Sequence, residues 1–363
     1  MSPYSQQGFA PQINNRSAKV YIAVSGGVDS ATSAATLLQA GCDCTAVYMK
    51  LYDQPLHKSS DAEKVAKYLG IPFEVLDLSE DFKKVIGYFC SEYKQARTPN
   101  PCVFCNRHIK FGRLFEYAKS KGADFIATGH YAQIIKEQDG SYLYAAANSA
   151  KDQSYALAML DRSVLKNIIF PLGRLEKKQT RKLAASLGLE VSDKPDSQEI
   201  CFIPDNDYAA KLEQLCPELI RQGNIIDGSG KILGTHTGIH RFTIGQRRGL
   251  KVAMGVPWYV TNIDAAANSV TLGPAEELVH KGLIAEGANW LIDKPAESFA
   301  AMIKIRYNHK PVPGTVFPEK DSVKVVFDTL IRAITPGQAV VFYLKNESGL
   351  KVAGGAWIKE TLD

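Results

Sequence analysis

The fold of this 363-residue chain is decided by the stretch Ala23-Val24-Ser25-Gly26-Gly27-Val28-Asp29-Ser30. It continues an apolar run, Lys19 to Val24, whose alternation is typical of a short buried strand. It leads into Ala31 to Ala40, a segment of strong helix formers. The sequence therefore predicts a tight turn that leads from a buried strand into a helix.

This turn has the composition of a phosphate-binding loop. Gly26 and Gly27 let the backbone approach an anion closely, and a helix N-terminus presents N–H groups to it. Ser30 is placed to cap the helix or to donate to a phosphate oxygen, and Asp29 to hold a magnesium-bound phosphate. An ordinary glycine-rich turn with a serine cap is the alternative. The chain has no G-x-x-x-x-G-K-[ST] pattern at this turn, so the turn is not a Walker loop.

The complete run S-G-G-V-D-S between strand and helix resembles the pyrophosphate loop (PP-loop) of ATP pyrophosphatases. That resemblance implies an enzyme that cleaves ATP between the α and β phosphates and adenylates an oxygen atom. It leaves the acceptor of the adenylate open.

Composition places the chain among globular proteins of two or three domains. A formal charge of +5 is compatible with a polyanionic partner. No apolar run approaches the roughly 18 residues of a membrane span, and the polar N-terminus does not resemble a signal peptide. We therefore expect no membrane partner.

Seven cysteines, odd in number and widely scattered, argue against a secreted disulfide scaffold and favour a reducing cytoplasm. Four of them lie in ordinary contexts and are predicted to be plain thiols: Cys42, Cys44, Cys90 and Cys216. The other three lie in unusual loops.

Strand-like and helix-like runs alternate from Lys19 to about Ile203, which predicts an α/β fold with a doubly wound parallel sheet. The expected strands are Val20–Val24, Cys44–Met49, Phe73–Leu76 and Phe125–Thr128, and the expected helices are Ser30–Ala40, Asp61–Leu69, Ile109–Ser120 and Gln179–Leu187. Ligands then belong at the carboxyl ends of the strands, where Ser25, Met49 and Gly129 fall.

The texture changes after this region. A short helical piece at Tyr208–Leu219 precedes glycine-punctuated extended runs, and period-two stretches separated by Pro and Gly turns follow Leu283. We predict a flexible tail over residues 1–18, an ATP pyrophosphatase catalytic domain over 19–205, a small linking domain over 206–280 and a C-terminal β-barrel over 281–363.

Two distant loops carry the unusual thiols. Two prolines precede the pair Cys102 and Cys105, which predicts an ordered loop and not a helix interior. Arg97, Arg107 and Lys110 flank this pair, and positive charge lowers the pKa of a thiol. The second loop, Lys194–Ile203, carries Cys201 beside an acid, an amide and a lysine. The sequence does not show whether the two loops meet.

Further motifs make the resemblance specific, because together they resemble the tRNA 2-thiouridylase family along nearly the whole chain. The motifs are S-G-G-V-D-S, T-P-N-P-x-x-x-C-N at Thr98–Asn106, A-T-G-H-Y-A at Ala127–Ala132, K-D-Q-S-Y at Lys151–Tyr155, K-P-D-S-Q-E-I-C at Lys194–Cys201, G-x-H-x-G-x-H-x-F-T-I-G-Q-R-R-G at Gly234–Gly249, R-Y at Arg306–Tyr307 and P-G-Q-A at Pro336–Ala339.

The resemblance implies a two-part reaction with ATP and Mg²⁺. ATP adenylates O2 of the wobble uridine of a tRNA. Cys201 corresponds to the thiol that carries sulfur as a persulfide, and Cys105 to the nucleophile that attacks it and forms a transient disulfide. The implied ATP-binding residues are Ala23, Val24, Ser25, Gly26, Gly27, Val28, Asp29, Ser30, Met49 and Gly129.

The resemblance also implies the RNA contacts and the partners. Asn100, Pro101 and Cys102 correspond to positions that border the flipped uridine, and other positions that face the tRNA are His130, Lys151, Asp152, Gln153, Arg306, Tyr307 and Gln338. Asp152 also suits a helix N-cap, His130 a core histidine and Arg306-Tyr307 a strand surface. Expected partners are tRNAs for lysine, glutamate and glutamine, with sulfur ultimately from a cysteine desulfurase.

The basic run Arg241 to Lys251, with Arg247 and Arg248 beside glycines, is a second candidate for phosphate contacts; a solvated turn is the alternative.

This chain departs from the family pattern at two places. Many members have an aspartate where this chain has Cys102, and a W-D-x-D run where this chain has Lys50-Leu51-Tyr52-Asp53 after Met49. Cys102, Cys105 and Cys201 together offer three ligands for a [4Fe-4S] cluster that would carry sulfide in place of the persulfide. Zinc with His108 as a fourth ligand is a further alternative.

Two other function classes stay open from the sequence. A small-molecule PP-loop ligase or amidotransferase would need no thiol pair, and a non-catalytic RNA-binding protein would not need to keep Asp29, Cys105 and Cys201.

Overall fold

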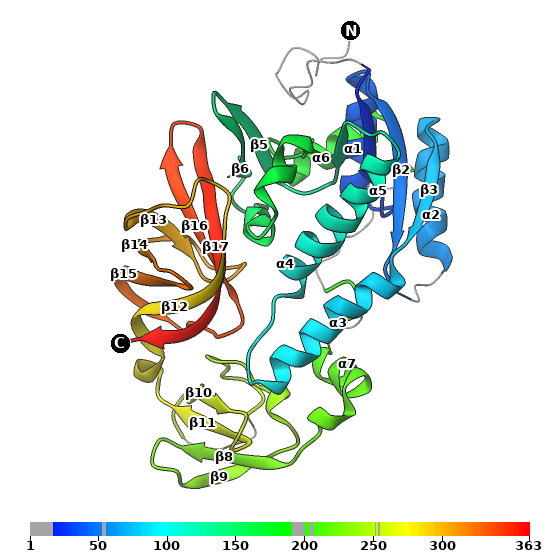
Figure 1. Cartoon of the computed structure of the whole chain (residues 1–363). Coiled ribbons are helices and arrows are strands. Elements are labelled where there is room, and N and C mark those ends of the chain that lie inside the picture. Colours follow the sequence, from blue (N-terminus) through cyan, green and yellow to red (C-terminus); the bar gives the residue numbers. More distant parts are fainter. Residues whose placement is uncertain (1–16, 53–55, 191–199, 204–206, 251, 253–254) are drawn as a thin grey trace.

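The structure is a computed structural model that describes residues 17–52, 56–190, 200–203, 207–250, 252 and 255–363 (Figure 1). The predicted 1–18 tail lies outside these residues except at its last two positions, and the motif residues 194–199 lie outside them entirely. No helix in the described part is long and apolar enough to cross a membrane.

A five-stranded sheet carries the N-terminal half, in the order β3-β2-β1-β4-β7 and with every described pairing parallel. Its strands are β1 (Lys19–Ala23), β2 (Asp43–Lys50), β3 (Phe73–Asp77), β4 (Phe125–Ala127) and β7 (Ile168–Ile169). Its helices are α1 (Val28–Gln39), α2 (Leu56–Leu69), α3 (Ser79–Lys94), α4 (Pro101–Cys105), α5 (Leu114–Ser120) and α6 (Lys177–Ser186). The predicted doubly wound parallel sheet is confirmed.

The side chains of β1 show why helices cover both faces of this sheet. Tyr21 and Ala23 lie in one apolar cluster with residues of α5, whereas Val20 and Ile22 lie in another with residues of α1 and α2. Successive residues of a strand point to opposite faces, so a strand that is buried at every position requires cover on both. The strand order reverses between β1 and β4, which puts the end of β1 where such folds bind ligands.

The C-x-x-C segment is helical, so the prediction of a loop is wrong. Pro101 occupies the first position of α4, where a missing N–H costs nothing, and the Asn100 side chain accepts a hydrogen bond from the Val103 N–H at 3.3 Å. A π-helical stretch, Asn106–Arg113, continues α4 into α5. The prolines therefore start a helix here.

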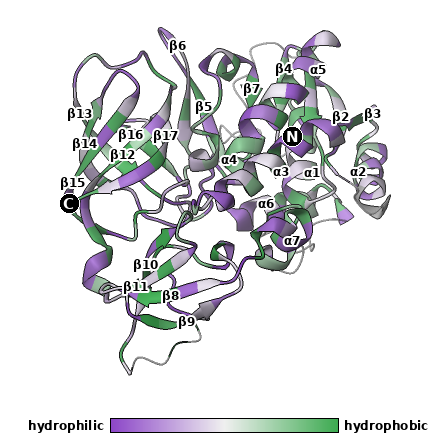
Figure 2. Cartoon of the chain, turned by 60° about the horizontal axis from the view of Figure 1, so that its bottom comes forward, coloured by the Kyte–Doolittle hydropathy of each residue, from purple (hydrophilic) through white to green (hydrophobic). Residues whose placement is uncertain are grey.

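The C-terminal part is the predicted β-barrel. Six strands close through pairing of the first with the last: β12 (Val279–Trp290), β13 (Phe299–Lys304), β14 (Val312–Pro318), β15 (Ser322–Arg332), β16 (Ala339–Asn346) and β17 (Gly349–Leu362). Hydrophobic and hydrophilic stretches alternate along them, as Figure 2 shows. The hairpin β5 (Ala132–Glu137) and β6 (Gly140–Ala145) of the N-terminal half extends the same sheet.

A middle unit connects the two. It consists of α7 (Tyr208–Leu215) and a four-stranded sheet in the order β10-β11-β8-β9. The strands are β8 (Gly223–Asp227), β9 (Ile232–His236), β10 (Tyr259–Asp264) and β11 (Ser269–Gly273). The predicted order of a parallel-sheet domain, a small linking unit and a barrel is confirmed as a fold class.

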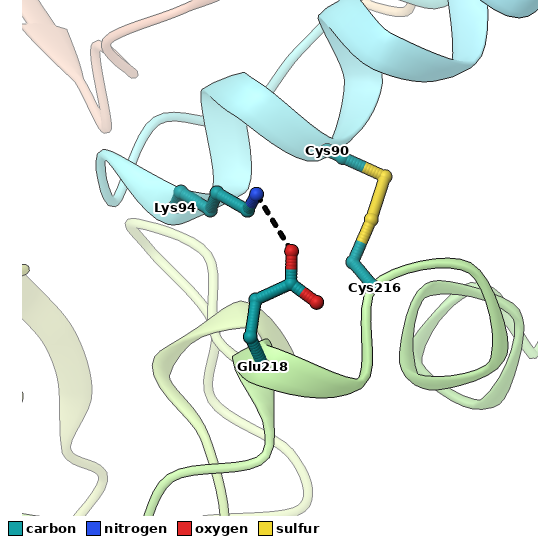
Figure 3. The surroundings of a disulfide bond; sticks show 4 residues. All are labelled: Cys90, Lys94, Cys216 and Glu218. Carbon is teal, nitrogen blue, oxygen red and sulfur yellow. Dashed lines mark ion pairs between the residues drawn. A yellow bond between two sulfur atoms is a disulfide. The ribbon is translucent and has the colours of Figure 1, made fainter.

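A disulfide joins Cys90 on α3 to Cys216 at the end of α7, so the prediction that both are plain thiols is wrong (Figure 3). The bond closes a sequence separation of 126 residues. Lys94 pairs with Glu218 at 2.7 Å beside it. Both cysteines belong to the apolar cluster between α3 and α7, a proximity that spacing in the sequence does not reveal.

Candidate functional site

The turn after β1 is held in shape by its own serines. The Ser30 hydroxyl accepts a hydrogen bond from the Ser25 N–H at 3.1 Å and donates to the Gly27 carbonyl at 3.1 Å. No side chain caps α1, whose N-cap is Gly27. Ser30 therefore folds the loop, while the start of the helix is left without a side-chain acceptor, as an anion site requires.

Two glycines of the predicted ATP site lie where no larger residue fits. A Cβ on Gly26, which has a φ of +77°, would lie 2.6 Å from Asp61 Cβ on α2. A Cβ on Gly129, just after β4, would lie 2.9 Å from Asp29 C and Ser30 N. Gly129 is thus brought against the loop, as the prediction required. Met49 is half-buried near the end of β2, next to this edge of the sheet.

Asp29 is the centre of a charged network that the sequence did not predict. Lys177 Nζ lies 2.8 Å from both carboxylate oxygens of Asp29, and the Tyr131 hydroxyl donates to Oδ1 at 2.8 Å. Lys177 stands in the first turn of α6, where a cation opposes the helix dipole. That unfavourable placement was the available signal that Lys177 has an acidic partner.

The thiols of the C-x-x-C helix are desolvated. Cys105 is 6% exposed, and burial raises the pKa of its thiol to about 12, although Lys110 partly opposes the shift. Cys102 is exposed as a residue, yet protein atoms surround its sulfur closely enough that desolvation raises its pKa as well. The prediction of lowered pKa values is wrong, because desolvation outweighs the one nearby cation that acts on the sulfurs.

Arg97 is not available to activate these thiols, since its guanidinium is paired with Glu92. Only Lys110 of the three flanking cations lowers the pKa of either thiol. The cationic flank seen in the sequence is thus mostly used elsewhere.

The structure brings the second thiol loop to the first. The negative charges of Cys201 and Cys102 both raise the pKa of Cys105, so the three sulfurs are near neighbours. Phe202, the residue after Cys201, packs edge-on against Phe82 and Phe89 of α3, with ring centroids 5.5 and 5.4 Å apart. The exposed Cys201 side chain therefore sits on a buried anchor.

The three thiols do not form a metal site as they stand. The described residues, which include Cys102, Cys105 and Cys201, contain no group of three His, Cys, Asp or Glu side chains that could hold a metal ion. The His108 ring lies 4.3 Å from the Phe104 ring, and desolvation lowers its pKa. We derive no reaction step through a cluster or through zinc.

The barrel holds the segment that precedes the thiols. Gln338 Nε2 donates to the carbonyls of Thr98 and Pro99 at 3.0 and 3.1 Å. The Thr98 N–H donates to the Pro336 carbonyl at 2.9 Å, and a Cβ on Gly337 would lie 2.9 Å from Thr98 O. The P-G-Q-A motif is therefore in direct contact with T-P-N-P.

Several predicted tRNA contacts also have partners within the protein. Arg306 donates to the carbonyls of Ile244 and Ala333, which ties the barrel to the middle unit. The Asp152 carboxylate accepts hydrogen bonds from the Ala146 and Ser154 N–H groups at 2.9 and 3.1 Å. Asp152 thus orders the chain locally, although the helix that follows is a short 3₁₀ turn and not the expected Gln153–Leu160.

The remaining predicted contacts lie in the same region. Gln153 Oε1 accepts from the Tyr131 N–H at 2.9 Å. His130 Nδ1 lies 2.7 Å from Thr128 Oγ1, and desolvation lowers its pKa, so the ring is neutral. Lys151 is half-buried. The roles of all these residues toward RNA stay predictions.

The basic run in the middle unit is divided. Arg247 and Arg248 are exposed, whereas Arg241 pairs with Glu213. Lys251 lies outside the described residues. The two exposed arginines keep the charge that phosphate contacts need.

Three family models match the chain in succession. They are described as a tRNA methyl transferase HUP domain over residues 18–205, a tRNA methyl transferase PRC-barrel domain over 211–274 and an aminomethyltransferase beta-barrel domain over 280–358.

Curated relatives match over almost their whole length. The "tRNA-specific 2-thiouridylase MnmA" of Carboxydothermus hydrogenoformans is 45% identical, covering 95% of this chain and 98% of the relative. The protein of the same name from Geotalea uraniireducens is 43% identical over 96% of this chain and 97% of the relative. Among solved structures, NMN synthetase from Francisella tularensis is 17% identical over 49% of this chain and 66% of that one, with a TM-score of 0.33, too low to carry an argument.

Proposed function

Because the chain belongs to the tRNA-specific 2-thiouridylase family, we propose that it is a tRNA-uridine 2-sulfurtransferase that thiolates the wobble uridine with ATP. The observation that carries this proposal is the assembly of two sites: a phosphate-binding turn after β1, and a thiol pair, Cys105 and Cys201, brought together from distant segments. The family models are described by methyl transfer, which needs neither site, whereas adenylation followed by sulfur transfer needs both.

The first half-reaction activates the base. The N–H groups at the start of α1 hold the ATP phosphates, with Gly26 and Gly129 allowing close approach. Uridine O2 attacks the α-phosphorus and pyrophosphate leaves. Asp29 is the carboxylate that fits Mg²⁺, which in such sites is held by one or two carboxylates together with the phosphates and would neutralise their charge. Lys177 would then exchange Asp29 for a phosphate oxygen.

The second half-reaction delivers sulfur. Cys201 is exposed and receives the sulfur as a persulfide. The Cys105 thiolate attacks Cys201 Sγ, the S–S bond of the persulfide breaks, and its terminal sulfur leaves as hydrosulfide. Hydrosulfide attacks C2 of the adenylated uridine and AMP leaves. A dithiol reductant then supplies two electrons and two protons to the Cys105–Cys201 disulfide.

Burial of Cys105 limits this step until the partner arrives. With a thiol pKa of about 12, almost none of Cys105 is a thiolate at neutral pH. The attack therefore requires proton loss coupled to persulfide binding, which also protects Cys105 from adventitious oxidation in the resting protein.

The partners follow from the same reading. The substrates are tRNAs for lysine, glutamate and glutamine, sulfur comes from a cysteine desulfurase or a relay protein, and the reaction takes place in the cytoplasm. The exposed Arg247 and Arg248 would contribute phosphate contacts.

Thiolation in vitro tests the proposal. Purified protein, ATP, magnesium, a sulfide source and an unmodified lysine tRNA are expected to give 2-thiouridine by nucleoside mass spectrometry. With persulfide as donor, Cys105→Ser and Cys201→Ser should abolish the product, while the matched control Cys42→Ser, a buried free thiol elsewhere, should keep it. Absence of 2-thiouridine under all reducing conditions would overturn the proposal, and full turnover by both serine variants would favour a small-molecule ligase.

The sulfur carrier needs a separate measurement. Anaerobically purified protein is expected to be colourless and active without iron. A brown protein whose activity follows its iron and acid-labile sulfide content would replace the persulfide relay by a cluster.

A further inference from the structure

Lys304, the last residue of β13, is a buried lysine to which the proposed reaction gives no role. It is 7% exposed, and its ammonium lies 5.7 Å from the ring centroid of Tyr155 and 5.5 Å from that of Tyr307. Within the described part of the chain, it makes no hydrogen bond and no ion pair. The two aromatic faces are its contacts there, and neither carries a full negative charge.

The nearest acid does not neutralise this lysine by contact. Asp152 attracts the ammonium electrostatically, but its carboxylate oxygens bond to the N–H groups of Ala146 and Ser154 and to the Ser154 hydroxyl. An unpaired buried ammonium is costly, and desolvation accordingly lowers the Lys304 pKa. A methionine would fill the same space without that cost, so the fold itself does not require a lysine here.

The position of Lys304 indicates what its charge is for. Tyr307, on one side of the ammonium, is close enough to Cys102 that the thiolate charge raises the tyrosine's pKa. Tyr155, on the other side, interacts with the Asn100 side chain. Lys304 thus stands between the predicted border of the flipped uridine and the predicted tRNA contacts Asp152 and Tyr307.

We propose that Lys304 binds a phosphodiester group that flanks the target uridine and so positions the extruded nucleotide over the thiol site. This inference rests on the proposed function, because it requires tRNA as the ligand. A phosphate oxygen completes the coordination of the ammonium, and the desolvated setting makes the charge-assisted hydrogen bond stronger than one at the surface. Extruding a base exposes the phosphates on both sides of it, and an enzyme must hold them to keep the base out.

The test is a cycle between a lysine variant and a neutral linkage. Binding is measured for an anticodon stem-loop with a methylphosphonate at the linkage 5′ or 3′ of the target uridine, for the wild-type protein and for Lys304→Met. Lys324→Met is the matched control, since Lys324 lies over the Phe317 ring on the same barrel but is exposed.

Lys304→Met is expected to weaken binding of the natural stem-loop about 10- to 100-fold and to reduce the salt slope by about one. One of the two neutral linkages should cost the wild-type protein a similar factor and cost Lys304→Met almost nothing. Lys324→Met should behave as wild type. Lys304→Arg should recover part of the affinity, and an unchanged melting temperature of Lys304→Met would show that its fold is intact.

Equal costs of both linkages in the wild type and in Lys304→Met would overturn the assignment, as would unchanged binding by Lys304→Met. If the wild type still thiolates the natural stem-loop, the proposed function survives that result. A wild-type protein that neither binds nor thiolates the stem-loop would overturn both.

Discussion

The ATP loop and the thiol site are built in opposite ways. The loop is nearly contiguous in sequence, its serines bond to one another, and its acid Asp29 already has the cation Lys177 at 2.8 Å. The thiol site is gathered from α4, the segment at Cys201 and the barrel, and its sulfurs are desolvated with raised pKa values. Activation therefore depends on a prepared polar cradle, whereas sulfur transfer depends on packing that keeps reactive groups protonated until they are needed.

The largest expected effect tests the close packing of the ATP loop. In Gly129→Ala the new Cβ would meet the backbone of Asp29 and Ser30 at 2.9 Å and displace the loop. A displacement of about 1 Å at a reacting group costs about 100-fold, so we expect that loss in kcat/KM for ATP. Gly228→Ala, with no atom within 4 Å of the new Cβ, is the control and should leave turnover unchanged. Normal ATP kinetics in Gly129→Ala would contradict the close approach.

Removing the cation of the loop should have the next largest effect. Lys177→Gln leaves Asp29 without its ion pair and removes a charge that would reach the phosphates, so we expect a 10- to 100-fold lower kcat/KM for ATP. Pyrophosphate release in the presence of tRNA is the measurement. Its exposed neighbour in Lys178→Gln supplies the control. Equal kinetics of the two variants would show that the ion pair is only structural.

A smaller effect should come from the barrel contact on the thiol side. Gln338→Ala removes two hydrogen bonds that hold Thr98 and Pro99 ahead of α4, and we expect kcat for thiolation to fall about 10-fold. The KM for ATP should not change, because the loop after β1 is untouched. Gln222→Ala on the exposed surface is the control. A raised KM for ATP would instead show that the two halves are coupled through the barrel.

The charge next to the thiols should have a modest, pH-dependent effect. Lys110 lowers the pKa of Cys102 and Cys105, so Lys110→Gln raises both pKa values further and reduces the thiolate fraction at a given pH. We expect alkylation of Cys102 by iodoacetamide to slow about threefold at pH 8, a difference that disappears once the pH exceeds both pKa values. Lys119→Gln, an exposed lysine on α5, should alkylate at the wild-type rate. A faster rate in Lys110→Gln would reverse the assigned sign.

The smallest effect on turnover is expected from the disulfide, which acts on stability. Cys90→Ala opens a link across 126 residues and should lower the free energy of unfolding by about 2–5 kcal/mol in oxidising buffer. Reductant should lower the melting temperature of the wild type and leave that of Cys90→Ala unchanged. Cys42→Ala, which lacks a free thiol and keeps the bond, should respond to reductant as the wild type does. An unresponsive wild type would contradict the Cys90–Cys216 bond.

The sequence predicted best where function and local structure coincide. The strands of the parallel sheet were expected to within one or two residues, because a strand buried on both faces is a continuous apolar run. The C-x-x-C segment was misjudged because proline both ends helices and begins them, and only the Asn100 cap decides between the two. The start of α6 was placed two residues late, which hid Lys177.

The sequence by itself determined the phosphate-binding turn, the parallel sheet and the residue types of the reaction, since each depends on neighbours along the chain. The tertiary structure decided which charges and thiols meet: Lys177 with Asp29, Cys201 with Cys105, Cys90 with Cys216 and Lys304 with two tyrosines. It also decided the direction of the thiol pKa shifts. Desolvation depends on the atoms packed around a group from every direction, and these come from segments that the sequence separates by a hundred residues or more.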